Sequence, residues 1–188
     1  MTIPQLLKLS KWTAFISFLL GTCIFLIYYF TSNFYLLFVG FAYIFLAVIF
    51  NLIILVLLFI RAFVDKNNRN KVLRTSIVML LNIPILIFYC YITRILINTM
   101  RIEFINLTEA QLNNIVITGC DQKHIDKLSP GEAKTVWIYI PTDCRIDIYY
   151  YLHGQKKSEN VIEYCGQASG RRLFYQIGKD KRIDKDLY

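Results

Sequence analysis

The chain has 188 residues, of which 56% are hydrophobic and 18% are charged, and its formal net charge is +8. Soluble globular domains are usually about 45–50% apolar and about 25% charged, so this composition excludes an ordinary cytosolic domain and a disordered basic tail. The charge is uneven, because residues 1–100 hold eight basic and one acidic residue whereas residues 101–188 hold 13 basic and 12 acidic residues. The basic surplus flanks apolar runs, so nucleic-acid binding is not expected.

Three apolar runs in the first hundred residues predict three transmembrane helices. A membrane-spanning helix needs about 20 apolar residues, with a range of roughly 17–25, and each run is long enough. Only residues 31–33 separate the first run from the second, which predicts a tight antiparallel hairpin. The runs cover residues 12–30, 34–60 and 76–93.

The basic residues predict the orientation of these helices, because short loops rich in Lys and Arg stay in the cytoplasm. The N-terminal segment and the 61–74 loop are basic, whereas residues 31–33 carry no charge. We therefore expect a bacterial inner-membrane protein with a cytoplasmic N-terminus and with residues 101–188 exported. The topology-setting residues are Lys8, Lys11, Arg61, Lys66, Arg69, Lys71 and Arg74.

Two asparagines and a proline interrupt the predicted spans. Asn51 lies in the second span and Asn82 in the third. A side-chain amide in lipid needs a hydrogen-bond partner, so both are expected to face another helix. There they either hold helices together or line a polar pathway. Pro84 has no backbone N–H to donate, which predicts a kink near Leu80.

The rest of the chain predicts an all-β domain. Hydrophobic and polar residues alternate along residues 135–140 and 145–153, which is the pattern of half-buried strands. Six or seven short strands favour a small antiparallel sandwich. The domains expected are a three-helix transmembrane domain (1–100), an exported β-sandwich domain (101–178) and a charged tail (179–188). Further candidate strands are residues 102–107, 112–118, 158–165 and 171–177.

One turn carries a family resemblance. The segment Leu128-Ser129-Pro130-Gly131-Glu132, followed by an alternating strand, resembles a turn of many immunoglobulin-like accessory domains in bacterial envelope proteins. The resemblance implies an immunoglobulin-like fold for residues 101–188 and implies no activity. The whole layout resembles small uncharacterised bacterial inner-membrane proteins with three helices and an exported β domain.

Three of the five cysteines lie in the β half, and an exported location permits a disulfide. Cys120 and Cys144 each lie at a strand end beside a turn. If strand 112–119 runs antiparallel to strand 144–152, these two ends meet, so Cys120–Cys144 is the favoured pair and Cys165 the unpaired thiol. The alternatives are the other two pairings, each of which leaves one thiol free, and a Cys120 and Cys144 that stay unlinked. The cysteine and histidine spacings predict neither a metal site nor another cofactor.

Four aromatic residues form a candidate partner surface. They occupy the outward phase of two strands that a tight turn connects. If these strands pair, the rings form one patch of the kind found at protein interfaces. If a second sheet or the linker after residue 94 covers them, they are core. The residues are Trp137, Tyr139, Tyr149 and Tyr151.

These patterns favour a membrane-anchored interaction module. No nucleophile elbow or phosphate-binding glycine loop is present in the sequence, so an enzyme is not expected. The favoured function is an accessory subunit of a cell-envelope complex, whose β domain docks an exported or membrane protein or a second copy of the chain. The alternatives are an oligomeric channel or transport component around Asn51 and Asn82, and an inner-membrane immunity or defence protein.

Overall fold

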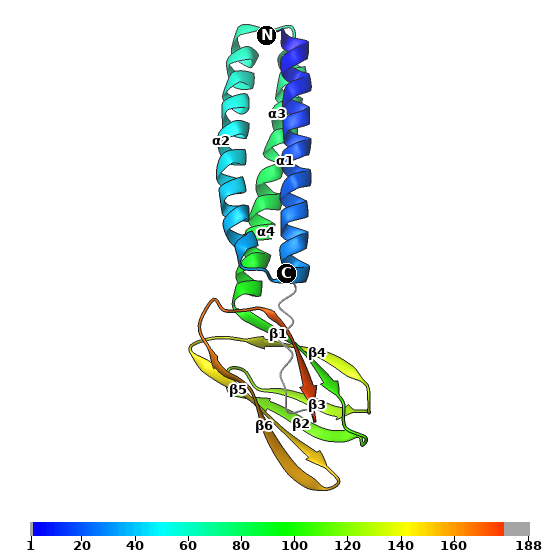
Figure 1. Cartoon of the computed structure of the whole chain (residues 1–188). Coiled ribbons are helices and arrows are strands. Elements are labelled where there is room, and N and C mark those ends of the chain that lie inside the picture. Colours follow the sequence, from blue (N-terminus) through cyan, green and yellow to red (C-terminus); the bar gives the residue numbers. More distant parts are fainter. Residues whose placement is uncertain (1, 179–188) are drawn as a thin grey trace. The chain divides into compact units, whose positions relative to one another are not determined.

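The computed structural model of the chain describes residues 2–178 (Figure 1). The chain divides into two compact units. The helical unit comprises residues up to 30 and residues 34–92, and the β unit comprises residues 31–33 and residues from 93 onward. The predicted charged tail, residues 179–188, lies outside the described residues.

Within residues 2–178, three helices are long and apolar enough to cross a membrane. The first two, α1 (Ile3–Thr31) and α2 (Tyr35–Val64), are continuous. The third is interrupted at Leu81, between α3 (Arg69–Leu80) and α4 (Asn82–Ile97). Pro84 lies in the first turn of α4, where a missing N–H is tolerated because no carbonyl of the same helix needs it. The predicted kink near Leu80 corresponds to this break.

The helical unit buries few side chains. Ser10, Thr75 and Ser76 are buried, and each hydroxyl donates to a carbonyl one turn earlier in its own helix. Many large apolar side chains are exposed; Phe45 and Phe63, for example, are 67% and 79% exposed. Helices that are apolar on all sides are typical of a lipid environment. The core comprises Leu6, Ala14, Ile54, Leu58, Ala62, Val72 and Met79.

The β unit contains two sheets in its described residues. Sheet A has the strand order β4-β1-β7 and sheet B the order β3-β2-β5-β6. Residues from both sheets form one hydrophobic core, in which Phe104 and Ile138 of sheet A and Ile117 and Ile148 of sheet B are fully buried. The strands are β1 (Thr99–Asn106), β2 (Leu112–Thr118), β3 (Lys123–Leu128), β4 (Ala133–Tyr139), β5 (Cys144–Leu152), β6 (Gln155–Cys165) and β7 (Arg172–Ile177).

The expectation of an entirely antiparallel sandwich is wrong at one pairing. β1 and β7 are parallel, with Arg101 opposite Arg172 and Asn106 opposite Ile177. The other paired strands are antiparallel. β1 and β7 are far apart in the sequence, so no tight turn fixes their relative direction. Alternation of polar and apolar residues indicates the buried face of a strand and carries no information on its direction.

Residues 128–132, whose sequence resembles a turn of immunoglobulin-like accessory domains, connect β3 to β4. Gly131 has φ +76°, a conformation that other residues rarely adopt. The Ser129 N–H donates to the Glu132 carboxylate at 2.8 Å, and this bond lowers the pKa of Glu132. The Gly131 N–H donates to the carbonyl of Asn106 at 2.7 Å, which joins the turn to the end of β1.

Candidate functional site

The basic residues predicted to set the topology lie on α1, at the end of α2, in the following connection and on α3, and all seven are exposed. A compact turn connects α2 to α3. The Asp65 carboxylate accepts the backbone N–H groups of Asn67 and Asn68 and the side-chain amide of Asn68, at 3.0, 3.2 and 3.1 Å. These bonds, the Asn68 side chain first, lower the pKa of Asp65. The carboxylate therefore orders a short connection that is otherwise rich in positive charge.

Both asparagines of the apolar helices contact α1. The Asn51 amide donates to Ser17 Oγ at 2.9 Å and to the carbonyl of Ala47 at 2.7 Å. The Asn82 amide donates to the carbonyl of Ala14 at 3.0 Å. Each side chain therefore connects its own helix to α1, which is the arrangement expected of polar groups that hold helices together.

The four aromatic side chains do not form one patch, because β4 and β5 do not pair. β4 pairs with β1 in sheet A, whereas β5 pairs with β2 and β6 in sheet B. Trp137 and Tyr139 alternate with the buried Ile138, so they lie on the outer face of sheet A. Tyr149 and Tyr151 flank the buried Tyr150 and lie on the outer face of sheet B. The sequence predicted pairing because a tight turn connects β4 to β5. At this turn, however, the chain crosses from sheet A to sheet B.

The aromatic pair of sheet A is the more exposed and has the more distinctive surroundings. Trp137 is 42% exposed and Tyr139 is 55% exposed. The guanidinium of Arg101, opposite Trp137 on β1, lies 5.6 Å from the centre of the indole ring. Arg101 is only 5% exposed and donates to Ser32 Oγ, also part of the β unit. The buried guanidinium of Arg101 therefore makes a cation–π contact with the indole ring of Trp137.

An ion pair on the same face holds the two parallel strands together. Arg172 donates to the Glu103 carboxylate at 3.1 Å, and its guanidinium lies 5.2 Å from the centre of the Phe174 ring. Sequence reasoning missed the roles of Arg101 and Arg172. Alternation places both on the outward phase of a strand, but only the parallel pairing of β1 and β7 makes them neighbours.

The aromatic pair of sheet B is partly covered by its own neighbours. The ammonium of Lys156 lies 5.2 Å from the centre of the Tyr149 ring, and Tyr149 is half-buried. Tyr151 is 43% exposed and lies opposite Asn113 on β2 and Lys156 on β6. This second surface is therefore more polar than the first.

Cys120 and Cys144 form a disulfide, as predicted, with their Cα atoms 5.2 Å apart. β2 and β5 are antiparallel, so the end of one meets the start of the other. Gly119, with φ +118°, allows the close approach: a Cβ atom at this position would lie 1.7 Å from the carbonyl oxygen of Arg145. The glycine therefore lets β2 end directly against the start of β5.

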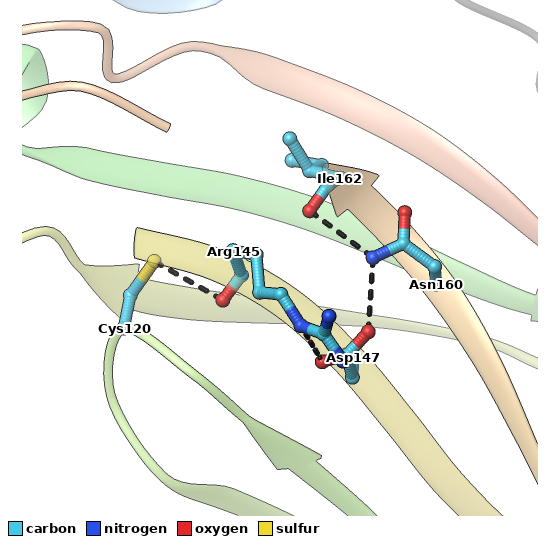
Figure 2. Close-up of polar contacts among 5 residues, drawn as sticks. All are labelled: Cys120, Arg145, Asp147, Asn160 and Ile162. Carbon is cyan, nitrogen blue, oxygen red and sulfur yellow. Dashed lines mark hydrogen bonds and ion pairs between the residues drawn. The ribbon is translucent and has the colours of Figure 1, made fainter. Parts of the chain in front are cut away.

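A buried carboxylate lies beside this disulfide. Figure 2 shows Asp147 between Arg145 and Asn160. Asp147 is 8% exposed, and it accepts Arg145 Nε at 2.6 Å and the Asn160 amide at 2.9 Å. The register of β5 and β6 shifts here, so side chains replace part of the regular backbone ladder. We assign this cluster a structural role, because each carboxylate oxygen of Asp147 has a donor. Among residues 2–178, no group of three His, Cys, Asp or Glu side chains is placed to hold a metal ion.

No protein-family model and no curated protein matches the chain. Among solved structures, the NMR structure of a protein from Eubacterium rectale is similar to part of it, with a TM-score of 0.34 and 16% sequence identity. The match covers 44% of this chain and 81% of that protein.

Proposed function

We propose that the protein is a membrane-anchored, non-enzymatic interaction module of a bacterial cell envelope. In this proposal the three apolar helices cross the inner membrane, with the N-terminus and the basic α2–α3 connection in the cytoplasm. The β unit is an immunoglobulin-like sandwich on the exported side, and it docks a protein partner of an envelope complex.

The exposed apolar side chains of the helices support the membrane assignment. In water, a surface with Phe45 and Phe63 largely exposed would cause aggregation, whereas in lipid such apolar side chains are favourably solvated. The seven exposed basic residues support the orientation, since they gather at the ends of the helices away from residues 31–33.

The single observation that carries the docking proposal is the pair Trp137 and Tyr139. Both are exposed and both lie on β4, which is an edge strand of sheet A in the described part of the chain. Aromatic side chains are enriched among the residues that dominate binding energy, and an edge strand also offers backbone hydrogen bonds to a partner. The cation of Arg101 fixes the indole ring in advance, which lowers the entropy lost on binding.

No comparable observation favours the channel or the immunity protein. The channel hypothesis depends on Asn51 and Asn82, and both amides are engaged with α1. These hydrogen bonds to α1 favour a role of both asparagines in helix packing over a role in a polar pathway.

The test is crosslinking of the full chain in membranes, followed by identification of the crosslinked protein. The double variant Trp137→Ala, Tyr139→Ala is compared with Tyr149→Ala, Tyr151→Ala, which removes the pair on the opposite face. Loss of two aromatic residues that dominate binding should weaken capture at least about tenfold, since such residues contribute about 2 kcal/mol or more and about 1.4 kcal/mol is tenfold in affinity. The control should capture normally. Equal capture by both variants would refute docking through β4.

A further inference from the structure

Three cysteines meet at one end of sheet B. Cys144 begins β5, the strand between β2 and β6. On one side it is bonded to Cys120, which follows β2. On the other side its register partner is Cys165, the last residue of β6 and a free cysteine. Cys144 therefore lies between a bonded cysteine and a free one.

The strand spacing permits an alternative disulfide between Cys144 and Cys165 and excludes one between Cys120 and Cys165. Residues directly opposite each other in antiparallel strands have Cα atoms about 4.5–5.5 Å apart, within the roughly 4.4–6.8 Å of disulfides. Cys144 and Cys165 occupy such opposite positions. β2 and β6 are separated by β5, so Cys120 and Cys165 are about two strand spacings, or roughly 9–10 Å, apart. That separation exceeds the about 7 Å limit for a disulfide without backbone movement.

We propose that Cys165 exchanges with the Cys120–Cys144 disulfide, so that the β unit has two disulfide isomers. The Cys165 thiolate attacks the sulfur of Cys144, a new bond forms between these two sulfurs, and the Cys120–Cys144 bond breaks. The electron pair of the broken bond moves to Cys120 Sγ, which takes up the proton that Cys165 released. One thiol and one disulfide are present before and after, so no oxidant or reductant is consumed.

The surroundings explain why Cys120–Cys144 is the resting isomer. Cys165 is 1% exposed, and burial raises the pKa of its thiol, although the nearby Arg171 acts in the opposite direction. The thiolate is therefore scarce until the end of β6 opens. The register shifts between Cys144 and Ile146 make the ladder irregular at this end, where local opening is easiest.

An acceptor is already in place for the displaced thiol. The sulfur of Cys120 lies 3.7 Å from the carbonyl oxygen of Arg145, a contact drawn in Figure 2. In the disulfide this sulfur has no hydrogen to donate, so the contact is only van der Waals. In the exchanged isomer the Cys120 thiol can donate to that oxygen, and it lies only partly buried beside a turn. The exchange would thus replace a buried thiol by one that an external thiol or disulfide can reach.

The test uses the full chain in membranes with Cys23→Ser and Cys90→Ser, so that only the three clustered cysteines react. Exchange is stopped with acid, the chain is unfolded so that buried thiols become accessible, and unpaired thiols are then alkylated near neutral pH. Disulfide-linked peptides are mapped without reduction. Both variants below are equilibrated in air-saturated buffer, so that oxygen is the oxidant. In the further variant Cys120→Ser, a Cys144–Cys165 bridge should form in most molecules, with loss of both alkylation signals. In the matched variant Cys144→Ser, both remaining thiols should alkylate fully. Two alkylated thiols in Cys120→Ser, or a Cys120–Cys165 bridge in Cys144→Ser, would overturn the proposal.

The chain that keeps all three cysteines provides a measurement independent of variant folding. After equilibration with substoichiometric dithiothreitol, the Cys144–Cys165 peptide should appear and alkylation of Cys120 should rise in parallel. If only the Cys120–Cys144 peptide is recovered, the exchange does not occur.

Discussion

The hydroxyl of Tyr175 donates to Glu159 Oε2 at 2.6 Å, and this bond joins β7 of sheet A to β6 of sheet B. The other carboxylate oxygen, Oε1, accepts the hydroxyl of Tyr150 on β5. Both tyrosines are buried, so the carboxylate satisfies two hydroxyls that would otherwise lose their bonds to water. One side chain therefore connects three strands and both sheets.

We expect Glu159→Gln to lower the free energy of unfolding of the β unit by about 2 kcal/mol. Hydrogen bonds to a charged group contribute roughly 1.5–3 kcal/mol, and the amide keeps only one acceptor oxygen for two donors. The measurement is urea unfolding of the full chain in detergent, followed by Trp137 fluorescence in a Trp12→Phe background. The control Glu109→Gln changes an exposed loop residue and should shift stability by less than about 0.5 kcal/mol. A Glu159→Gln chain as stable as this control would show that the bridge contributes nothing.

The same cluster predicts an alkaline limit to stability. Burial first, and then the Glu159 carboxylate, raise the pKa of Tyr150 above its ordinary value of 10.0. Because the folded state holds the proton more tightly than the unfolded state, this stabilisation is complete below about pH 10 and is lost as the pH rises above it. Tyr150→Phe should therefore flatten the alkaline decline in unfolding free energy.

Tyr164→Phe is the matched control for that pH profile. A hydrogen bond to Asp143 raises the pKa of Tyr164, but its side chain is 67% exposed, so water screens the effect. This variant should keep the alkaline decline of the parent chain. An alkaline decline that persists in Tyr150→Phe and disappears in Tyr164→Phe would contradict the prediction, because it would show that Tyr164 and not Tyr150 causes the loss of stability.

Gly119→Ala should destabilise the β unit far more than Gly154→Ala. Both glycines have positive φ, +118° and +77°, so both substitutions carry a backbone penalty of order 1–3 kcal/mol. At Gly154 nothing lies within 4 Å of an added Cβ, whereas at Gly119 the Arg145 carbonyl oxygen would lie 1.7 Å away. Comparable unfolding free energies for the two variants would contradict the close approach of β2 to β5.

Replacing Cys144 should destabilise the β unit more than replacing Cys165. The disulfide joins residues 24 apart in sequence, and the chain-entropy model assigns such a loop roughly 3–4 kcal/mol. Cys144→Ser should lose this stabilisation, whereas Cys165→Ser keeps the Cys120–Cys144 bridge and should be milder. Equal losses in the two variants would mean that packing of Cys165, and not the bridge, dominates.

Local patterns in the sequence predicted much of the fold. Continuous hydrophobicity is a property of each helix alone, so three long apolar helices follow from the sequence without any tertiary information. The Cys120–Cys144 pair was also predictable from the sequence, because each cysteine lies at a strand end and adjacent antiparallel strands bring such ends together. β3 was missed, since Lys123–Leu128 has four polar or charged residues and only Ile125 and Leu128 are buried.

Relations between strands were not predictable in this way. Alternation shows which face of a strand is buried and does not show which strand lies next to it. The alternation correctly predicted that Trp137 and Tyr149 point outward. The prediction that they share one patch was wrong, because β4 and β5 belong to different sheets. The burial of Arg101 and the bridge from Glu159 to Tyr175 likewise depend on β1–β7 pairing and on sheet packing.

The most direct test of the central proposal is the membrane topology of the chain, measured by thiol labelling of intact cells. Two exposed positions each receive a new cysteine. Asn67 lies in the basic connection between α2 and α3, and Glu109 lies in the loop between β1 and β2; the variants are Asn67→Cys and Glu109→Cys. Each is introduced with Cys23→Ser and Cys90→Ser, and the chain without the new cysteine gives the background. A membrane-impermeant maleimide should label Glu109→Cys in intact cells and Asn67→Cys only after lysis. Labelling of Asn67→Cys from outside intact cells, or protection of Glu109→Cys until lysis, would contradict a cytoplasmic basic end and an exported β unit.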